Sequence, residues 1–146
     1  MRKQALRLFF GVSVSVLLAV VSVGANSGLK VRATIPFDFT VGEKTLPAGI
    51  YTIEAIDPQG VLAIRSENYT RGILIKTGAM HAKNDPEPAK LVFRKYGDVY
   101  FLGEVWGYDA GQEVFKSRKE RQMIRDLRQH LARGAAEPTL VYIAAN

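Results

Sequence analysis

Apolar and polar residues alternate along much of this chain with the two-residue period of β-strands. Between Leu29 and Tyr108, short runs of β-branched and aromatic residues are separated by turn residues. Phe37, Phe39 and Val41 alternate with polar neighbours, as expected when one face of a strand is buried. Short strands at this spacing predict a mainly β fold, either an antiparallel β-sandwich or a small barrel.

Glycine and proline mark the reversals between these strands. The clearest hairpin joins Lys90–Tyr96 to Val99–Trp106 through Gly97-Asp98. The segment Lys76–Lys90 is polar and rich in turn residues, which predicts an exposed loop. Proline at the second position and glycine at the fourth favour tight turns. Two such turns are predicted, at 46–49 and 57–60, and a further tight reversal is predicted at 41–44.

The last forty residues contain the one helical pattern. Ser117 to Glu120 reads S-x-x-E, a capping box, and Gly134 is a typical stop, so a helix is predicted over about 117–133. Its apolar residues share one face, which we expect to cover one end or face of the sheet; they are Met123, Ile124, Leu127 and Leu131. A final strand is predicted at 139–143, pairing either within the chain or with a neighbour.

The first 25 residues have the three-part pattern of a secretory signal peptide. Arg2, Lys3 and Arg7 precede an apolar run over residues 8–23, and small residues end at Ala25. This run is shorter than the about 20 residues that a membrane-spanning helix needs. We therefore expect cleavage after Ala25 and export to the periplasm or the medium, with no membrane span left in residues 26–146.

Composition narrows the possible chemistry of the exported domain, residues 26–146. The chain has no cysteine, which excludes disulfides, thiolate metal sites, a cysteine nucleophile and a lipid-modified cysteine anchor. The net charge of +6 falls to +3 once the leader is removed. Residues 116–133 hold seven basic and two acidic residues, a local charge of +5, whereas residues 26–115 have a local charge of −1, so the high isoelectric point reports one basic segment.

Several segments resemble a family of small, signal-peptide-bearing bacterial proteins. The resemblance lies in Ile35–Gly42 (IPFDFTVG), Leu46–Thr52 (LPAGIYT), Tyr96–Leu102 (YGDVYFL) and Lys116–Arg121 (KSRKER). It implies a compact, secreted β-rich domain of bacterial origin. It supplies no catalytic residues that could be carried over to this chain.

Two groups of side chains are candidates for binding. Arginines of the basic segment could contact phosphates or anionic lipid; they are Arg118, Arg121, Arg125 and Arg128. Three aromatic residues, Tyr100, Trp106 and Tyr108, could line a surface for a ligand, although aromatics at alternate strand positions are more often part of a core. Nucleic acid is not expected as a partner, because the strand region is not basic and the chain carries an export signal.

Catalytic motifs are missing from the sequence. No G-x-S-x-G elbow accompanies the two histidines, His81 and His130, and no calcium-loop or phosphate-loop pattern occurs. Asp38 and Glu104 stand in apolar strands and could form a carboxylate pair, with His81 as a further acid-base group. No cofactor or metal is expected.

Three functional hypotheses remain open at this stage. The first is a non-enzymatic exported domain that acts through binding, with a protein or the cell envelope as partner. The second is an anion-binding module that uses the basic helix at 116–133. The third is a small hydrolase that uses Asp38, Glu104 or His81.

Overall fold

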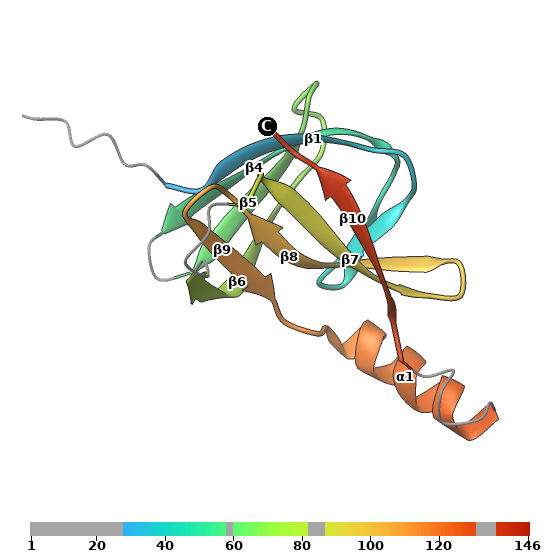
Figure 1. Ribbon diagram of the computed structural model, residues 1–146. Coiled ribbons are helices and arrows are strands. Elements are labelled where there is room, and N and C mark those ends of the chain that lie inside the picture. The colour runs from blue at the N-terminus through green and yellow to red at the C-terminus, as the bar shows by residue number, and fades with distance from the viewer. Residues whose placement is uncertain (1–27, 58–59, 82–86, 131–136) are drawn as a thin grey trace, which may run out of the picture.

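The computed structural model describes residues 28–57, 60–81, 87–130 and 137–146, which form ten β-strands and one α-helix (Figure 1). The strands are β1 (Lys30–Ile35), β2 (Phe39–Val41), β3 (Lys44–Leu46), β4 (Gly49–Asp57), β5 (Val61–Ser66), β6 (Gly72–His81), β7 (Lys90–Tyr96), β8 (Val99–Trp106), β9 (Ala110–Val114) and β10 (Thr139–Ala144). The helix is α1 (Arg118–His130). The prediction of a mainly β fold with one helix and a final strand is confirmed. The predicted leader, residues 1–25, lies outside the described residues.

The strands form one curved sheet, and all of its pairs except one are antiparallel. The path runs β1-β4-β5-β6-β9-β8, and β8 then pairs with β7, which pairs with β10. Strand β6 joins two halves of the sheet, since residues 72–76 pair with β5 and residues 77–81 with β9. The β2–β3 hairpin meets β8 through a parallel bridge between Thr40 and Phe101.

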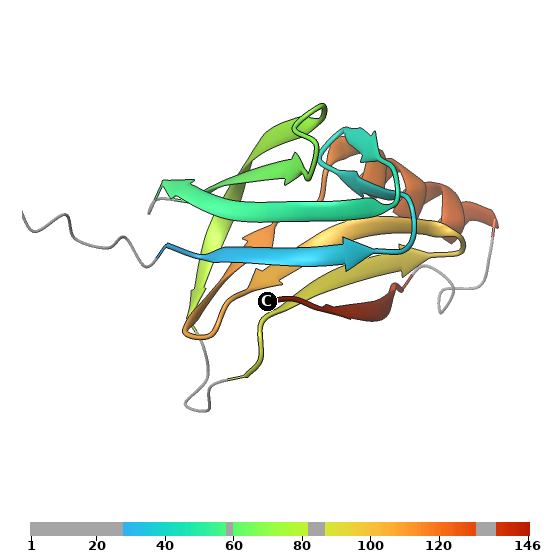
Figure 2. The same cartoon turned by 90° about the horizontal axis from the view of Figure 1, so that it is seen from above.

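The two ends of this path meet at a single point. The backbone groups of Arg32 in β1 and Asn146, just beyond β10, exchange two hydrogen bonds of 2.7 and 3.0 Å (Figures 1 and 2). No ladder joins β1 to β10, so the sheet is not a closed barrel. Strand β10 pairs with β7 of the same chain over its whole length, so of the two pairings that the sequence allows, within the chain or with a neighbour, the structure has the first.

The core lies on the concave side of the sheet. In β1 alternate residues are buried and exposed, with Val31, Ala33 and Ile35 inside. Phe39 and Val41 are buried as predicted, and Phe37 is partly buried against the same cluster. The edge-to-face packing of Phe39 on Tyr51 and Phe93 joins both halves of the sheet around one core.

Two stretches differ from the sequence prediction. The predicted loop 76–90 is wrong over its first part, because β6 continues to His81; residues 82–86 lie outside the description. Gly78 suits this strand because the Phe115 ring lies over it, only 3.1 Å from where a Cβ would stand. Strand β9 was not predicted: its buried Gln112 accepts a hydrogen bond of 2.5 Å from the Thr77 hydroxyl, which replaces apolar packing.

The helix does not cover the sheet as expected. Along α1 only Glu120 is buried, whereas Met123, Ile124 and Leu127 of the predicted apolar face are partly exposed. Leu131, the fourth residue of that face, and the predicted end of the helix at 133 lie outside the described residues. Figure 1 shows that α1 starts close to the sheet and then projects away from it. The helix is therefore fixed mainly through its first turn. Within the described ranges, no helix is long and apolar enough to cross a membrane.

Candidate anion-binding surface on helix α1

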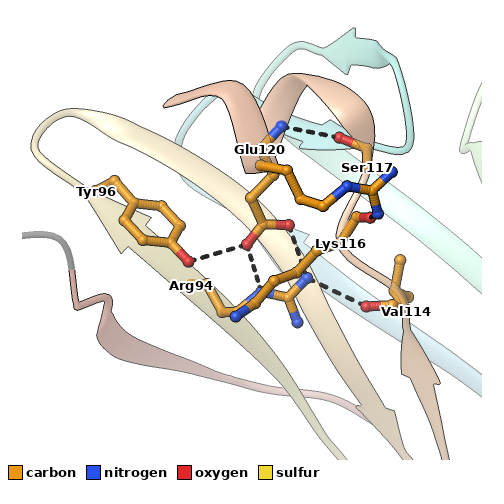
Figure 3. A network of polar contacts seen from close by, with 7 residues as sticks. Arg94, Tyr96, Val114, Lys116, Ser117 and Glu120 are labelled. Carbon is orange, nitrogen blue, oxygen red and sulfur yellow. Dashed lines mark hydrogen bonds and ion pairs between the residues drawn. The ribbon is translucent and has the colours of Figure 1, made fainter. Parts of the chain in front are cut away.

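A buried ion pair fixes the first turn of α1 to the outer face of β7 (Figure 3). Arg94 donates to both carboxylate oxygens of Glu120, from Nε at 2.6 Å and from Nη2 at 2.9 Å. Arg94 Nη2 also donates to the carbonyl of Val114 at 3.1 Å, and the Tyr96 hydroxyl donates to Glu120 Oε1 at 3.1 Å. Glu120 is 1% exposed and Arg94 is 9% exposed, so both charges depend on each other and on these hydrogen bonds.

The sequence around this pair leaves room for the arginine. Gly103 of β8 lies beside Arg94, and a Cβ there would stand 2.7 Å from Arg94 Nη1 and 3.2 Å from the carbonyl of Val92. The β7–β8 register shifts between Val92 and Phe93, next to this point. Glycine at position 103 therefore allows the long side chain to reach across β8 to the helix.

The helix start is capped by side chains from two parts of the chain. The Ser117 hydroxyl accepts a hydrogen bond from the Glu120 amide at 3.1 Å, as the S-x-x-E pattern predicts. The Glu120 carboxylate contacts Arg94 and Tyr96 instead of completing the capping box. Glu43, at the β2–β3 turn, accepts from the Arg118 amide at 2.9 Å, and this places the helix beside that hairpin.

Tyr96 reports on this buried cluster through its titration. Burial, followed by the charge of Glu120 and the hydrogen bond to it, raises the pKa of Tyr96 from 10.0 to about 12. Because the folded-state pKa is the higher one, the resulting stability is present below pH 10 and is lost as the pH rises towards 12. We expect a tyrosinate absorbance step near pH 12 that disappears in Tyr96→Phe. A variant that keeps the step would show that it belongs to another tyrosine.

The four predicted arginines form one exposed stripe along α1. Their spacing of three, four and three residues places Arg118, Arg121, Arg125 and Arg128 on the same helical face. Arg121 donates to the carbonyl of Lys116 at 2.5 Å. In the described part of the chain no carboxylate forms an ion pair with any of the four. We call these four residues the arginine stripe; together they place four positive charges along about 15 Å of helix.

The opposite side of α1 carries a shallow hollow of ≈ 460 Å³. It is lined by Lys119, Gln122, Met123, Asp126, Leu127 and His130. His130 Nδ1 lies 2.8 Å from the carbonyl of Asp126, one turn earlier. Met123 and Leu127 therefore face away from the arginine stripe, whereas Ile124, also partly exposed, lies between the hollow and the stripe.

The predicted aromatic residues do not come together. Tyr100 stacks on Phe37, with ring centroids 3.8 Å apart and an interplanar angle of 14°, near the start of β8. Trp106, at the other end of β8, donates from Nε1 to Glu104 at 2.6 Å. Six residues of strand separate them, about 20 Å. Tyr108 is 64% exposed beyond the strand, so only Trp106 and Tyr108 lie in the same region.

Two of the candidate hydrolase residues, Asp38 and Glu104, have structural partners and lie apart. Asp38 accepts a hydrogen bond of 2.9 Å from the Ala48 amide, which fixes the turn between β3 and β4. From the Thr40–Phe101 bridge, Asp38 and Glu104 lie five residues apart along the strands, about 16 Å. A glycosidase pair needs roughly 5–10 Å. His81 ends β6 opposite Ala110, and its side chain lies outside the description.

Neither a metal site among the residues that the structure describes nor a relative of known function adds to this picture. Over the described ranges, no three His, Asp or Glu side chains gather closely enough to hold a metal ion. The chain matches no family model, no curated protein and no solved structure.

Proposed function

We propose that this chain is an exported, non-enzymatic binding domain that associates with an anionic partner, such as the cell envelope, through the arginine stripe of α1. The observation that carries the proposal is four exposed arginines on one helical face with no carboxylate paired to them in the described residues. Exposed guanidinium groups bind phosphate and carboxylate through paired hydrogen bonds. The latch formed by Arg94 and Glu120 gives the stripe a fixed place relative to the sheet.

Other features support the non-enzymatic part of this proposal. Asp38 and Glu104 each accept a hydrogen bond from a nearby protein group, and their separation is too large for a carboxylate pair. Export stays part of the proposal because of the charged start, the apolar run and the small residues before position 26. The resemblance to small exported bacterial proteins also stays a prediction.

The arginine stripe can be tested with long-chain inorganic polyphosphate as the probe. Arg125 and Arg128 are exposed and supply no side-chain hydrogen bond to the latch, so Arg125→Gln/Arg128→Gln removes two charges and leaves the bonds between Arg94, Tyr96 and Glu120 in place. We expect saturable binding that weakens with added salt, and about tenfold weaker binding by the double variant. Fluorescence anisotropy of labelled polyphosphate would measure both effects.

A matched control separates the stripe from the overall charge. Lys30→Gln/Lys76→Gln removes the same two charges from exposed positions in β1 and β6. We expect this variant to bind nearly as well as the native protein. Equal losses in both double variants, or no salt-dependent binding by the native protein, would contradict the proposed role of α1.

A further inference from the structure

The turn between β5 and β6 stands out from the body at the top of Figure 1 and holds a tyrosine in an unfavourable backbone conformation. Tyr69 has φ = 55°, the only positive φ among described residues other than glycine, and it is 81% exposed. The left-handed region costs an L-residue with a large side chain roughly 1–2 kcal/mol, and Asn or Gly would fit it better. Such strain clusters at sites that use the side chain.

The turn is held rigid by its own hydrogen bonds. The Asn68 side-chain oxygen accepts from the Ser66 hydroxyl at 2.8 Å and from the Thr70 hydroxyl at 2.7 Å. The backbone adds bonds from the Tyr69 amide to the Ser66 carbonyl and from the Ser66 amide to the Arg71 carbonyl, both 2.9 Å. The exposed ring of Tyr69 is therefore presented on a preorganised support, which lowers the entropy lost on binding.

Two hollows flank this turn and share Ser66 and Glu67 in their walls. One, of ≈ 300 Å³, is lined by Lys30, Arg32, Thr52, Glu54, Arg65, Ser66, Glu67 and Tyr69. The other, of ≈ 410 Å³, lies between the turn and the start of β4 and includes Asn68, Thr70 and Arg71. Both volumes fall in the range of small-ligand sites. The wall of the first is mostly polar, which selects against an apolar ligand, and the wall of the second is mixed.

The charges around the first hollow largely compensate each other. Arg32 pairs with Glu67, and Arg65 lies 3.5 Å from Glu54. The side chains of both pairs remain between 36% and 57% exposed, so their unused donors and acceptors are accessible to a ligand. A ligand with many hydroxyl groups and no net charge fits such a surface, because each hydroxyl can both donate and accept.

We infer that this surface is a carbohydrate-binding site, in which a neutral sugar ring lies against Tyr69 and its hydroxyls contact the charged pairs around the first hollow. A second sugar unit would reach the other hollow across the turn, so the ligand class is a neutral oligosaccharide. The site is independent of the arginine stripe, which lies on α1 and would bind anions. Neither site requires the other.

The experiment titrates the exported protein, residues 26–146, with three neutral probes: cellotetraose, maltotetraose and tetra-N-acetylchitotetraose. We expect saturable chemical-shift changes with at least one probe, confined to residues around the β5–β6 turn. Tyr69→Ala should weaken this binding roughly three- to tenfold, and Tyr69→Phe should keep most of it, because the ring supplies the contact. Tyr142→Ala, at another exposed position on β10, is the matched control and should bind normally.

The backbone strain at Tyr69 allows a second test, because relieving it should change stability and binding in opposite directions. Tyr69→Asn places a residue suited to the left-handed region at this position, so its unfolding midpoint should equal or exceed that of the native protein. Its binding of the oligosaccharide should fall as in Tyr69→Ala. No binding of any of the three probes up to about 10 mM, a concentration at which weak sites fill, would overturn the inference. So would binding that Tyr69→Ala leaves unchanged.

Discussion

Replacing Glu120 with alanine is expected to lower the free energy of unfolding by about 3–5 kcal/mol, because the Arg94 guanidinium would stay buried without its carboxylate. Tyr96 would also lose its hydrogen-bond acceptor. Guanidinium-induced unfolding, followed through the fluorescence of the single tryptophan, Trp106, would measure the change. Glu113→Ala, at an exposed position on β9, is the control and should change stability by about 0.5 kcal/mol or less.

A double replacement separates the net worth of the ion pair from the cost of breaking it. Arg94→Met/Glu120→Leu removes both charges and keeps most of the side-chain volume. Buried pairs replaced in this way are often neutral or stabilising, so we expect the double variant to recover most of the loss seen in Glu120→Ala. A double variant as unstable as the single one would show that charge is not what makes this site sensitive.

The same variants test whether Glu120 positions the helix. Because Glu120 is the one buried residue of α1, its loss should detach the arginine stripe from β7 while the sheet persists. Trypsin cleaves after arginine, so it should cut the helix faster in Glu120→Ala than in the native protein. The comparison is made without denaturant, at a temperature where the Trp106 fluorescence of the variant is still native-like. Cleavage at the native rate would mean that the contacts of Ser117 and Glu43 are enough to hold the helix.

Local patterns in the sequence predict the elements whose signals are local. The β7–β8 hairpin and its turn at Gly97 lie where the alternation and the Gly-Asp pair place them, and Gly97 has φ = 60°. The cap at Ser117 and the spacing of the arginine stripe likewise depend only on neighbouring residues. Strand β9 was not predicted, because its burial depends on the hydrogen bond that Gln112 accepts from Thr77, 35 residues away in the sequence.

The latch could not be predicted for the same reason. Glu120 looks like the last residue of a capping box, and nothing near it in the sequence indicates a partner 26 residues earlier. One signal was available, since Arg94 follows Phe93 and stands two residues before Tyr96, and both of these are suited to burial. An arginine buried there requires a carboxylate from another element. The sequence therefore indicates that Arg94 needs an acidic partner, but it does not indicate that this partner is Glu120.

The inner face of β7 should be at least as sensitive as the outer face that carries Arg94. Phe93 is fully buried, and its ring packs edge-to-face on Phe37 at 5.2 Å and on Phe39 at 5.6 Å. Strand β7 also holds β8 on one side and β10 on the other. We expect Phe93→Ala to cost about 3–5 kcal/mol of unfolding free energy, from lost burial and from the cavity left among these rings.

Phe115→Ala deletes the same atoms from a position that is 55% exposed, and it should cost less than about 1 kcal/mol. Comparable losses in the two variants would contradict the assignment of Phe93 to the centre of the core. The Tyr96 titration then distinguishes the two faces of β7. If the inner and outer faces are independent, Phe93→Ala keeps the step near pH 12, whereas Glu120→Ala removes a cause of that raised pKa and moves the step lower.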